Sequence, residues 1–319
     1  MKNIVIIGGG TGTSTLLKGL KKYPANLSVI VSTADDGGST GRLRKELGVL
    51  PPGDIRQCVV ALSQKPKMAE EFNFRYSAGP FKGHTVGNLI LANLEKQYGV
   101  NTSLAIVSEA LKVKGQVLPV TLKPTILSAV LENGKKLVGE HNIDVPEKRA
   151  AIKTISLSPN LPVNPKIVQA LHKADAIVLG PGDLFTSVLP SLLVKGVKEA
   201  MDKSSAKKVL VGNIMTQPGQ TDSYSPLDFV EVVNKYLGKK KLDTVLVNTK
   251  KPAAKVLADL KKQGALFIFP KVKDLTGIKV VKADLVDKTT HKKAKGDVLN
   301  RSLLRHDSHK LAKLIWGLV

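Results

Sequence analysis

The sequence is poor in the residues that build several common kinds of site. It has one cysteine in 319 residues, which excludes an intrachain disulfide framework and a cysteine-based zinc site. No apolar run approaches the roughly 18 residues of a membrane span. The short apolar run at 4–7 is followed at once by glycine, unlike the core of a signal peptide. We therefore expect a soluble, cytoplasmic protein without membrane insertion, in which Cys58 is a buried thiol.

Aromatic residues and arginines are also scarce, although the chain is strongly basic. Aromatics make up 4% of the sequence, which is little for stacking on bases. The formal net charge is +23, but only seven of the 49 basic residues are arginine, and the lysines are scattered along predicted helices and turns. Scattered lysines are typical of a solvated surface, so we expect no nucleic-acid partner. Four arginines fall between positions 42 and 75, and Arg301 and Arg305 lie near the C-terminus; arginine suits phosphate through its bidentate fork.

The chain opens with the order of elements that α/β proteins use to bind phosphate. A β-branched strand at 4–7 is followed by glycines and then by leucines at helical spacing. Glycines let the backbone approach an anion closely, and the first N–H groups of the helix point at it. The dinucleotide fingerprint G-x-G-x-x-G is not met, because Thr13 stands at the third glycine position, and no lysine follows Gly12 as in Walker A. We interpret the turn as a nonstandard phosphate loop, formed by Gly8, Gly9, Gly10, Thr11, Gly12 and Thr13. The alternative is a glycine turn without a ligand.

Paired acids follow the second predicted strand, 27–32. Asp35 is placed where a Rossmann-like unit meets a ribose hydroxyl. Asp36 adds a second carboxylate, and the pair could instead hold Mg²⁺. The structural alternative is an Asp-Gly turn with a capping aspartate.

Two further junctions between a loop and a helix carry candidate residues. In PPGDIRQ, Asp54 and Arg56 lie on the first turn of a helix expected over 55–62, where both could face the cleft. The structural alternative is that Asp54 only caps this helix and Arg56 lies on the surface. In GHTVGN, His84 and Asn88 are four residues apart, so they would share a helix face. A lone histidine is usually structural, but this pair at a glycine-flanked helix start is a site candidate.

The rest of the chain predicts one α/β domain over residues 1–319 with a small insertion. Between about 116 and 155 apolar and polar residues alternate, and Asn133-Gly134 separates two such runs, which is typical of an antiparallel hairpin. Buried strands are expected at 176–179, 209–211, 242–247 and 266–269, with helices ending near 173 and spanning 190–201, 227–237 and 253–263. We predict a Rossmann-like three-layer fold with a mainly parallel sheet. The basic tail ends in an amphipathic helix, and Arg305, His306 and Asp307 before it either close over a ligand or cap the helix.

Glycine-rich polar loops follow at least four of these strands, with the sequences GGGTGTS, TADDGGS, GPGDLFTS and GNIMTQPGQTD. Because the carboxyl ends of parallel strands share one edge of a sheet, the loops are expected to converge on one ligand site. This convergence is stronger evidence than any single motif.

The motifs occur in the order of a known superfamily. GGGTGTSTLLKGL, TADDGGSTGRLR, PPGDIRQCVVAL, GHTVGNLILANL, GPGDLFTS and NIMTQPGQTD together resemble the family of 2-phospho-L-lactate transferases (CofD) and bacterial gluconeogenesis factors (YvcK-like). The resemblance covers the chain to about residue 225 and is nearest to the gluconeogenesis factors. Asp183 and Phe185 stand where serine and tyrosine are common, Gln220 replaces glutamate, and HTVGN replaces HSLGN.

The resemblance implies a nucleotide cleft at the carboxyl ends of the strands. It implies that Gly8 to Thr13 hold phosphate and that Asp35 and Asp36 are the family's paired acids. Further contacts to the nucleotide or acceptor are expected from Asn88, Gly180, Pro181, Gly182, Asp183, Asn213, Thr216, Gln217 and Arg305.

Three functions remain open, in order of preference. The first is a regulator of cell shape and gluconeogenic growth that binds a nucleotide or nucleotide-sugar, such as UDP-GlcNAc, UDP-glucose or a dinucleotide. The second is a CofD-like, Mg²⁺-dependent transferase, with Asp35 or Asp36 on the metal and Arg56 or His84 stabilising charge. A nucleic-acid-binding protein is the weakest hypothesis. Exposed helices and the insertion could form a homodimer, and a regulator implies a protein partner, but the sequence decides neither.

Overall fold

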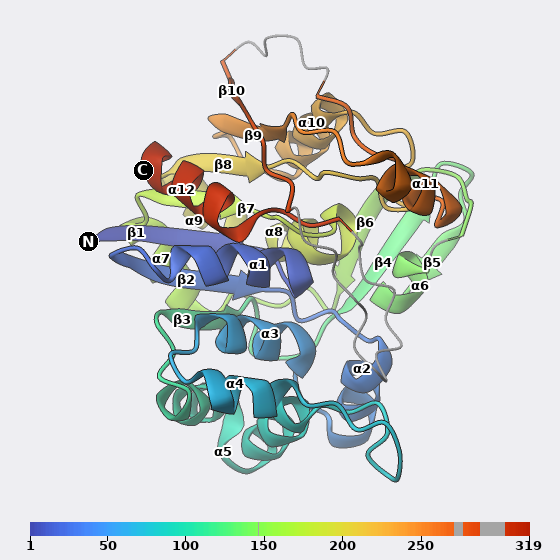
Figure 1. The fold of residues 1–319 in the computed structure, drawn as a ribbon. Coiled ribbons are helices and arrows are strands. Elements are labelled where there is room, and N and C mark those ends of the chain that lie inside the picture. The colour runs from blue at the N-terminus through green and yellow to red at the C-terminus, as the bar shows by residue number, and fades with distance from the viewer. Residues whose placement is uncertain (146, 271–276, 288–303) are drawn as a thin grey trace.

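A seven-stranded parallel sheet forms the centre of the computed structural model, which describes residues 1–145, 147–270, 277–287 and 304–319 (Figure 1). The strand order is β10-β9-β8-β7-β1-β2-β3. The bounds are β1 (Lys2–Ile7), β2 (Ala25–Val31), β3 (Gln116–Pro119), β7 (Ala176–Leu179), β8 (Lys207–Val211), β9 (Thr244–Asn248) and β10 (Lys279–Ala283). Every strand pair in this sheet is parallel, which confirms the predicted α/β class.

The strand order reverses direction at the middle of the sheet. From β1 the chain proceeds to β2 and β3 on one side, and from β7 to β8, β9 and β10 on the other. Ile7 at the end of β1 is in register with Ile30 of β2 and with Leu179 of β7. Such a reversal leaves a crevice beyond the carboxyl ends of the two central strands, and open α/β sheets bind ligands there.

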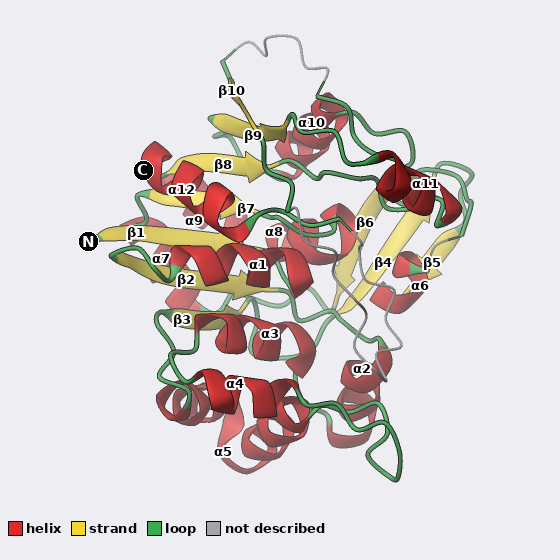
Figure 2. Cartoon of the chain, viewed as in Figure 1, coloured by secondary structure: helices red, strands yellow, loops and turns green. Residues whose placement is uncertain are grey.

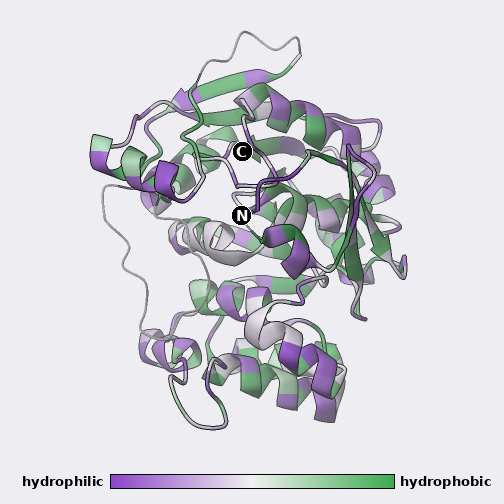
Figure 3. Ribbon diagram, turned by 90° about the vertical axis from the view of Figure 1, so that its right-hand side faces the viewer, coloured by the Kyte–Doolittle hydropathy of each residue, from purple (hydrophilic) through white to green (hydrophobic). Residues whose placement is uncertain are grey.

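Helices cover both faces of the sheet, as the alternation of side chains along β1 shows. Ile4 and Ile6 pack into a core with α1 (Gly10–Leu20), α3 (Pro52–Leu62) and α12 (Ser308–Leu318). Val5 and Ile7 pack into the opposite core with α7 (Pro165–Lys173), α9 (Val197–Lys203) and α10 (Pro226–Tyr236). Because successive side chains of a strand point to opposite faces, this pattern requires two helical layers. Hydrophobic residues accordingly concentrate on the strands of the sheet in Figure 3.

The remaining helices connect and flank the strands of the sheet. A helical segment between β2 and β3 comprises α2 (Gly38–Leu47), α3, α4 (Pro66–Asn73) and α5 (Val86–Ala110), which bends at Gly99. In Figure 1, α4 and α5 lie beyond α3, at the end of the molecule marked by the edge strand β3. Shorter helices are α6 (Glu140–Asp144), α8 (Leu189–Leu193) and α11 (Ala254–Lys262), and a π-helical turn spans Leu184–Val188. Within the described residues, no helix has the length and apolar character needed to cross a membrane.

The predicted insertion is present but begins later than expected. A separate antiparallel sheet contains β4 (Ile126–Leu131), β5 (Lys136–Val138) and β6 (Ile152–Ser158), in the order β5-β4-β6 (Figure 2). Its hairpin turns at Asn133-Gly134, as predicted, and Gly134 has a φ of +82°. The run at 116–119 was expected to belong to the insertion, but it is β3 and pairs with β2 in the main sheet. Alternation of apolar residues does not distinguish a short parallel edge strand from a hairpin strand.

Three other local expectations differ from the structure. The helix predicted over 190–201 is divided into α8 and α9, because Gly196 between them has a φ of +100°. The strand predicted at 266–269 contributes only one bridge, between Phe267 and Met215, and the seventh strand of the sheet is β10 instead. His84 precedes its helix, since α5 begins at Val86 with Thr85 as the cap. Cys58 is fully buried, as predicted.

Candidate functional site

A cleft of about 300 Å³ lies at the carboxyl edge of the sheet, where the strand order reverses. The loops after β1, β2, β7 and β8 all contribute to it, as the sequence predicted. The start of α3, helix α6 of the insertion and the segment before α12 complete the lining. The volume is at the lower end of the range found for small-molecule sites.

The loops after β1 and β7 are packed directly on each other at the floor of this cleft. Thr13 Oγ1 donates a hydrogen bond of 3.0 Å to the carbonyl of Pro181. A Cβ atom on Gly12 would lie 2.7 Å from the same carbonyl oxygen, so the close approach requires glycine there. Gly9, Gly10, Thr11 and Gly12 line the cleft together with Pro181, Gly182 and Asp183, whereas Gly8, Thr13 and Gly180 lie behind them.

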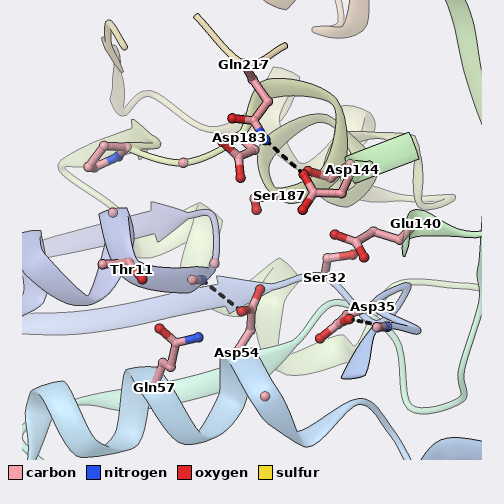
Figure 4. A pocket seen from close by; sticks show the side chains of 18 of the residues that line it. Thr11, Ser32, Asp35, Asp54, Gln57, Glu140, Asp144, Asp183, Ser187 and Gln217 are labelled. Atoms are coloured by element: carbon pink, nitrogen blue, oxygen red, sulfur yellow. Dashed lines mark hydrogen bonds between the residues drawn. The ribbon is translucent and has the colours of Figure 1, made fainter. Parts of the chain in front are cut away.

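The first N–H groups of α1 are partly occupied by a side chain of the protein itself. Asp54 Oδ1 accepts a hydrogen bond of 2.9 Å from the N–H of Gly10. The sequence left open whether Asp54 caps its own helix or faces the cleft. Helix α3 begins at Pro52 and has no side-chain cap, and Asp54 instead lines the cleft and reaches α1 (Figure 4). Burial raises the pKa of Asp54, and the Gly10 hydrogen bond and the Arg56 charge oppose that effect.

Four more carboxylates share the cleft with Asp54. In Figure 4 the side chains of Asp35 and Asp54 lie on one side, and those of Glu140, Asp144 and Asp183 face them. Burial, together with the neighbouring carboxylates, raises the pKa of Asp35 and that of Asp183 to about 7. The pKa of Glu140 is raised well above its usual value by burial and then by Asp35. A cleft with this electrostatic character favours cations, protonated carboxyls or hydroxyl donors.

The two acids of the ADDGG motif point in different directions. Asp35 lines the cleft and accepts a hydrogen bond from the N–H of Gly37. Asp36 instead accepts a 2.8 Å hydrogen bond from the N–H of His141 at the start of α6 and does not line the cleft. The structure therefore brings Asp35 close to Asp54 rather than to Asp36, and Mg²⁺ binding by either acid stays a prediction.

A buried chain of hydrogen bonds supports one wall of the cleft. Asn88 accepts from Arg56 Nε at 3.0 Å and donates to Ser39 Oγ at 3.0 Å, and Ser39 Oγ is 2.9 Å from His84 Nδ1. Arg56 also donates to Asn73 Oδ1. Arg56 and Asn88 line the cleft, whereas His84 lies behind Ser39 and does not. Because these groups bond one another, the network fixes the position of the Arg56 guanidinium at the cleft wall.

Other predicted residues are divided between the cleft and its surroundings. Asn213, Thr216 and Gln217 from the loop after β8 line the cleft, and Asn213 donates to the carbonyl of Gly182 at 3.1 Å. Arg305 and His306 also line it, while Asp307 caps α12 through the N–H groups of its first turn. Arg301 and the basic start of the tail lie outside the described residues.

Sequence reasoning missed the contribution of α6. Glu140, His141 and Asp144 line the cleft, and Asp144 Oδ1 accepts from Gln220 Nε2 at 3.0 Å and from Gln217 Nε2 at 3.3 Å. Asp36 binds the other end of the helix through His141. The helix therefore bridges the β2 and β8 sides of the crevice. Glu140 and Asp144 follow the hairpin that turns at Asn133-Gly134. Nothing in the sequence indicated that this segment folds back to line the cleft.

Taken together, these features define an α/β protein with a polar cleft at the point where the strand order of its sheet reverses, which we call the switch-point cleft. The family model described as "2-phospho-L-lactate transferase CofD" matches residues 4–286, and the chain belongs to this family. The gluconeogenesis factor of Bacillus subtilis is 38% identical over 322 residues, covering 99% of this chain and 98% of that protein. A Thermotoga maritima relative is 41% identical over 315 residues and 98% of each chain. A crystal structure of a UPF0052-family protein from Bacillus halodurans aligns with a TM-score of 0.90 and 37% identity over 99% of both chains.

Proposed function

We propose that this protein binds a nucleotide-sugar of the UDP-GlcNAc type in the switch-point cleft and regulates cell morphogenesis during gluconeogenic growth. UDP-glucose and a dinucleotide are the alternative ligands of the same cleft. The observation that carries the proposal is the convergence of four strand-end loops on one cleft. The name of the Bacillus subtilis relative supports the metabolic part.

The chemistry of the lining suits a ligand that contains both phosphate and sugar. The glycine loop and Arg56 supply donors near the reversal of the strand order, where phosphates would be placed. Asp144, Asp183 and Gln217 lie on the other side, where carboxylates would accept from sugar hydroxyls and the amide would donate or accept. Of the five carboxyl groups that line the cleft, Asp54 and Asp35 lie beside the glycine loop, so a bare diphosphate placed at this loop would be repelled.

A divalent cation would remove that repulsion. Among the described residues, no group of three or more His, Cys, Asp and Glu side chains is arranged to hold a metal. Mg²⁺ usually binds through one or two carboxylates together with substrate phosphates and water rather than in an all-protein cage. Asp35 and Asp54 fit that role, since both line the cleft next to the glycine loop. The cation would neutralise the diphosphate, and these two residues would orient it.

Calorimetry combined with product analysis tests the proposal. UDP-GlcNAc titrated into the protein in Mg²⁺ buffer should release heat with micromolar affinity, and chromatography of the mixture should return the ligand unchanged. Titration with UDP-glucose and with NAD would rank the alternatives. If none of these ligands gives a binding signal, the nucleotide-sugar proposal is wrong.

A CofD-like transferase is the second candidate, and one observation favours it. Asp35 and Asp183 both have a pKa raised to about 7, near the value that suits general acid–base catalysis at neutral pH. The proposed reaction moves a phospholactyl-type group from a guanosine diphospho-lactyl donor to an acceptor hydroxyl. The acceptor oxygen bonds to the lactyl-bearing phosphorus, the bond from this phosphorus to the bridging oxygen breaks, and GMP leaves while a carboxylate takes the hydroxyl proton. Mg²⁺-dependent GMP release that Asp35→Asn abolishes would support it, and an intact donor after prolonged incubation with a deazaflavin acceptor would exclude it.

A further inference from the structure

Asp54 occupies the position in which glycine-loop folds usually hold a ligand's phosphate. The N–H groups at the start of α1 carry the positive end of the helix dipole, which favours one anion. Gly10, the first residue of α1, already donates its N–H to Asp54 Oδ1 at 2.9 Å. Asp54 comes from α3, 44 residues further along the chain. The carboxylate of Asp54 therefore links the N-termini of α1 and α3 at the cleft.

The glycine at position 9 makes room for this carboxylate. A Cβ atom built on Gly9 would lie 1.8 Å from Asp54 Oδ2 and 2.6 Å from its Cγ. At Gly10 the nearest atom to such a Cβ is again in Asp54, at 3.9 Å. Part of the glycine-rich turn thus accommodates the carboxylate of Asp54, and not only the phosphate of a ligand.

The surroundings make this carboxylate repel an incoming phosphate. Asp35 also lines the cleft and lies close to the start of α3. A Cβ atom built on Gly53, the residue before Asp54, would lie 3.2 Å from Asp35 Oδ2. The charge of Arg56 opposes that of Asp54, but its guanidinium also donates hydrogen bonds to Asn88 and Asn73. Asp54, together with Asp35, which is only partly ionised near neutral pH because its pKa is raised to about 7, thus creates a negative potential where a phosphate would otherwise bind.

We propose that Asp54 is a specificity-determining residue, which makes the cleft accept a nucleotide diphosphate only together with a divalent cation. The inference rests on the proposed nucleotide-binding function and deepens it. The carboxylate of Asp54 occupies the N-terminus of α1 and repels free phosphate. The cation restores attraction by lying between the phosphates and the carboxylates of Asp54 and Asp35. A chain lacking the charge at position 54 would bind the nucleotide without metal.

The test compares UDP-GlcNAc binding in Mg²⁺ and in EDTA by calorimetry. The wild-type protein should bind at least about tenfold more weakly in EDTA, which corresponds to about 1.4 kcal/mol. Asp54→Asn keeps an acceptor oxygen for Gly10 but loses the charge, so its affinities in the two buffers should agree within about twofold. Asp54→Ser, smaller and neutral, should give the same result if the asparagine variant does not fold.

Asp202→Asn is the matched control. Asp202 also accepts backbone N–H groups, from Lys239 and Lys240, and its Oδ2 would lie 2.2 Å from a Cβ on Gly238, yet it does not line the cleft. This variant should keep the wild-type ratio of affinities. A wild-type protein that binds equally well in EDTA, or an Asp54→Asn protein that keeps the Mg²⁺ dependence, would overturn the inference. Loss of all binding by the wild-type protein in both buffers would instead refute the proposed function, and the inference with it.

Discussion

Replacing Gly9 by alanine should destabilise the protein through Asp54 and not through the backbone. Gly9 has φ −148° and ψ −175°, an extended conformation that alanine adopts readily. The new methyl group, however, would lie 1.8 Å from Asp54 Oδ2, so the carboxylate has to leave the Gly10 N–H. A hydrogen bond to a charged group contributes about 1.5–3 kcal/mol, and an anion at a helix N-terminus about 0.3–1 kcal/mol. Relief of the repulsion from Asp35 offsets part of this, and we expect a net loss of about 2 kcal/mol in the free energy of unfolding.

Urea unfolding followed by circular dichroism measures this change, and a double-mutant cycle assigns it. With Asp54→Ala already present there is no carboxylate to displace, so Gly9→Ala should then cost less than about 0.5 kcal/mol. Gly317→Ala is the control, because a Cβ at position 317 meets no atom within 4 Å and lies in α12. It should leave stability unchanged or slightly raised. If Gly9→Ala costs the same with and without Asp54, the carboxylate is not what requires glycine at position 9.

Three further predictions follow from the cleft. Because the pKa of Asp35 and that of Asp183 are raised to about 7, the folded protein holds protons that the unfolded chain releases near pH 4. This contribution to stability is present below about pH 4 and is lost as the pH rises through about 7. Asp35→Asn should therefore flatten the fall of the urea midpoint between pH 5 and 8, and an unchanged fall would contradict the assignment. Asn88→Ala, which removes a buried partner of Arg56, should cost about 1–3 kcal/mol in urea unfolding and weaken UDP-GlcNAc binding in calorimetry; full retention of both would show that the network is dispensable. Gly10→Val should abolish that binding while the fold survives, whereas Gly48→Val, at a similar positive φ but outside the cleft, should bind normally; equal binding by both variants would count against the phosphate loop.

The regular elements of the sheet were predictable because their signals are local. Ala176–Leu179 was identified to the residue, since four consecutive apolar side chains between a helix end and a glycine allow few alternatives. The convergence of the loops also followed, because parallel strands place their carboxyl ends at one edge. The apolar run at 266–269 was predicted to be a strand on the same kind of signal, and there the prediction was wrong. An apolar run indicates burial, and pairing partners decide whether it becomes a strand; β10, with half-buried valines and flanking lysines, carries a weaker signal but pairs with β9.

Long-range contacts set the parts of the site that local signals could not predict. Helix α6 is only five residues long and follows a hairpin, so its position over the cleft depends on contacts with Asp36 and with Gln217 and Gln220. The separation of Asp35 from Asp36 has the same origin, because the N–H of His141, 105 residues away, draws Asp36 aside. Adjacent acids in a sequence therefore do not imply a shared ligand.

The glycine loop shows why a motif can be recognised without its chemistry being known. From the sequence, GGGTGTS predicts space for an anion next to the start of a helix. In the structure that space is partly taken by Asp54, and the remaining cleft is lined by more carboxylates than arginines. The net charge of +23 is carried largely by lysines scattered along the sequence. Salt screens the interaction between such distant exposed charges and the cleft, so they do little to offset the charge of Asp54 at the glycine loop. In the proposed binding mode the cation that balances the site comes with the ligand. The Mg²⁺ dependence of binding therefore separates a glycine loop that binds phosphate directly from one that already holds the carboxylate of Asp54.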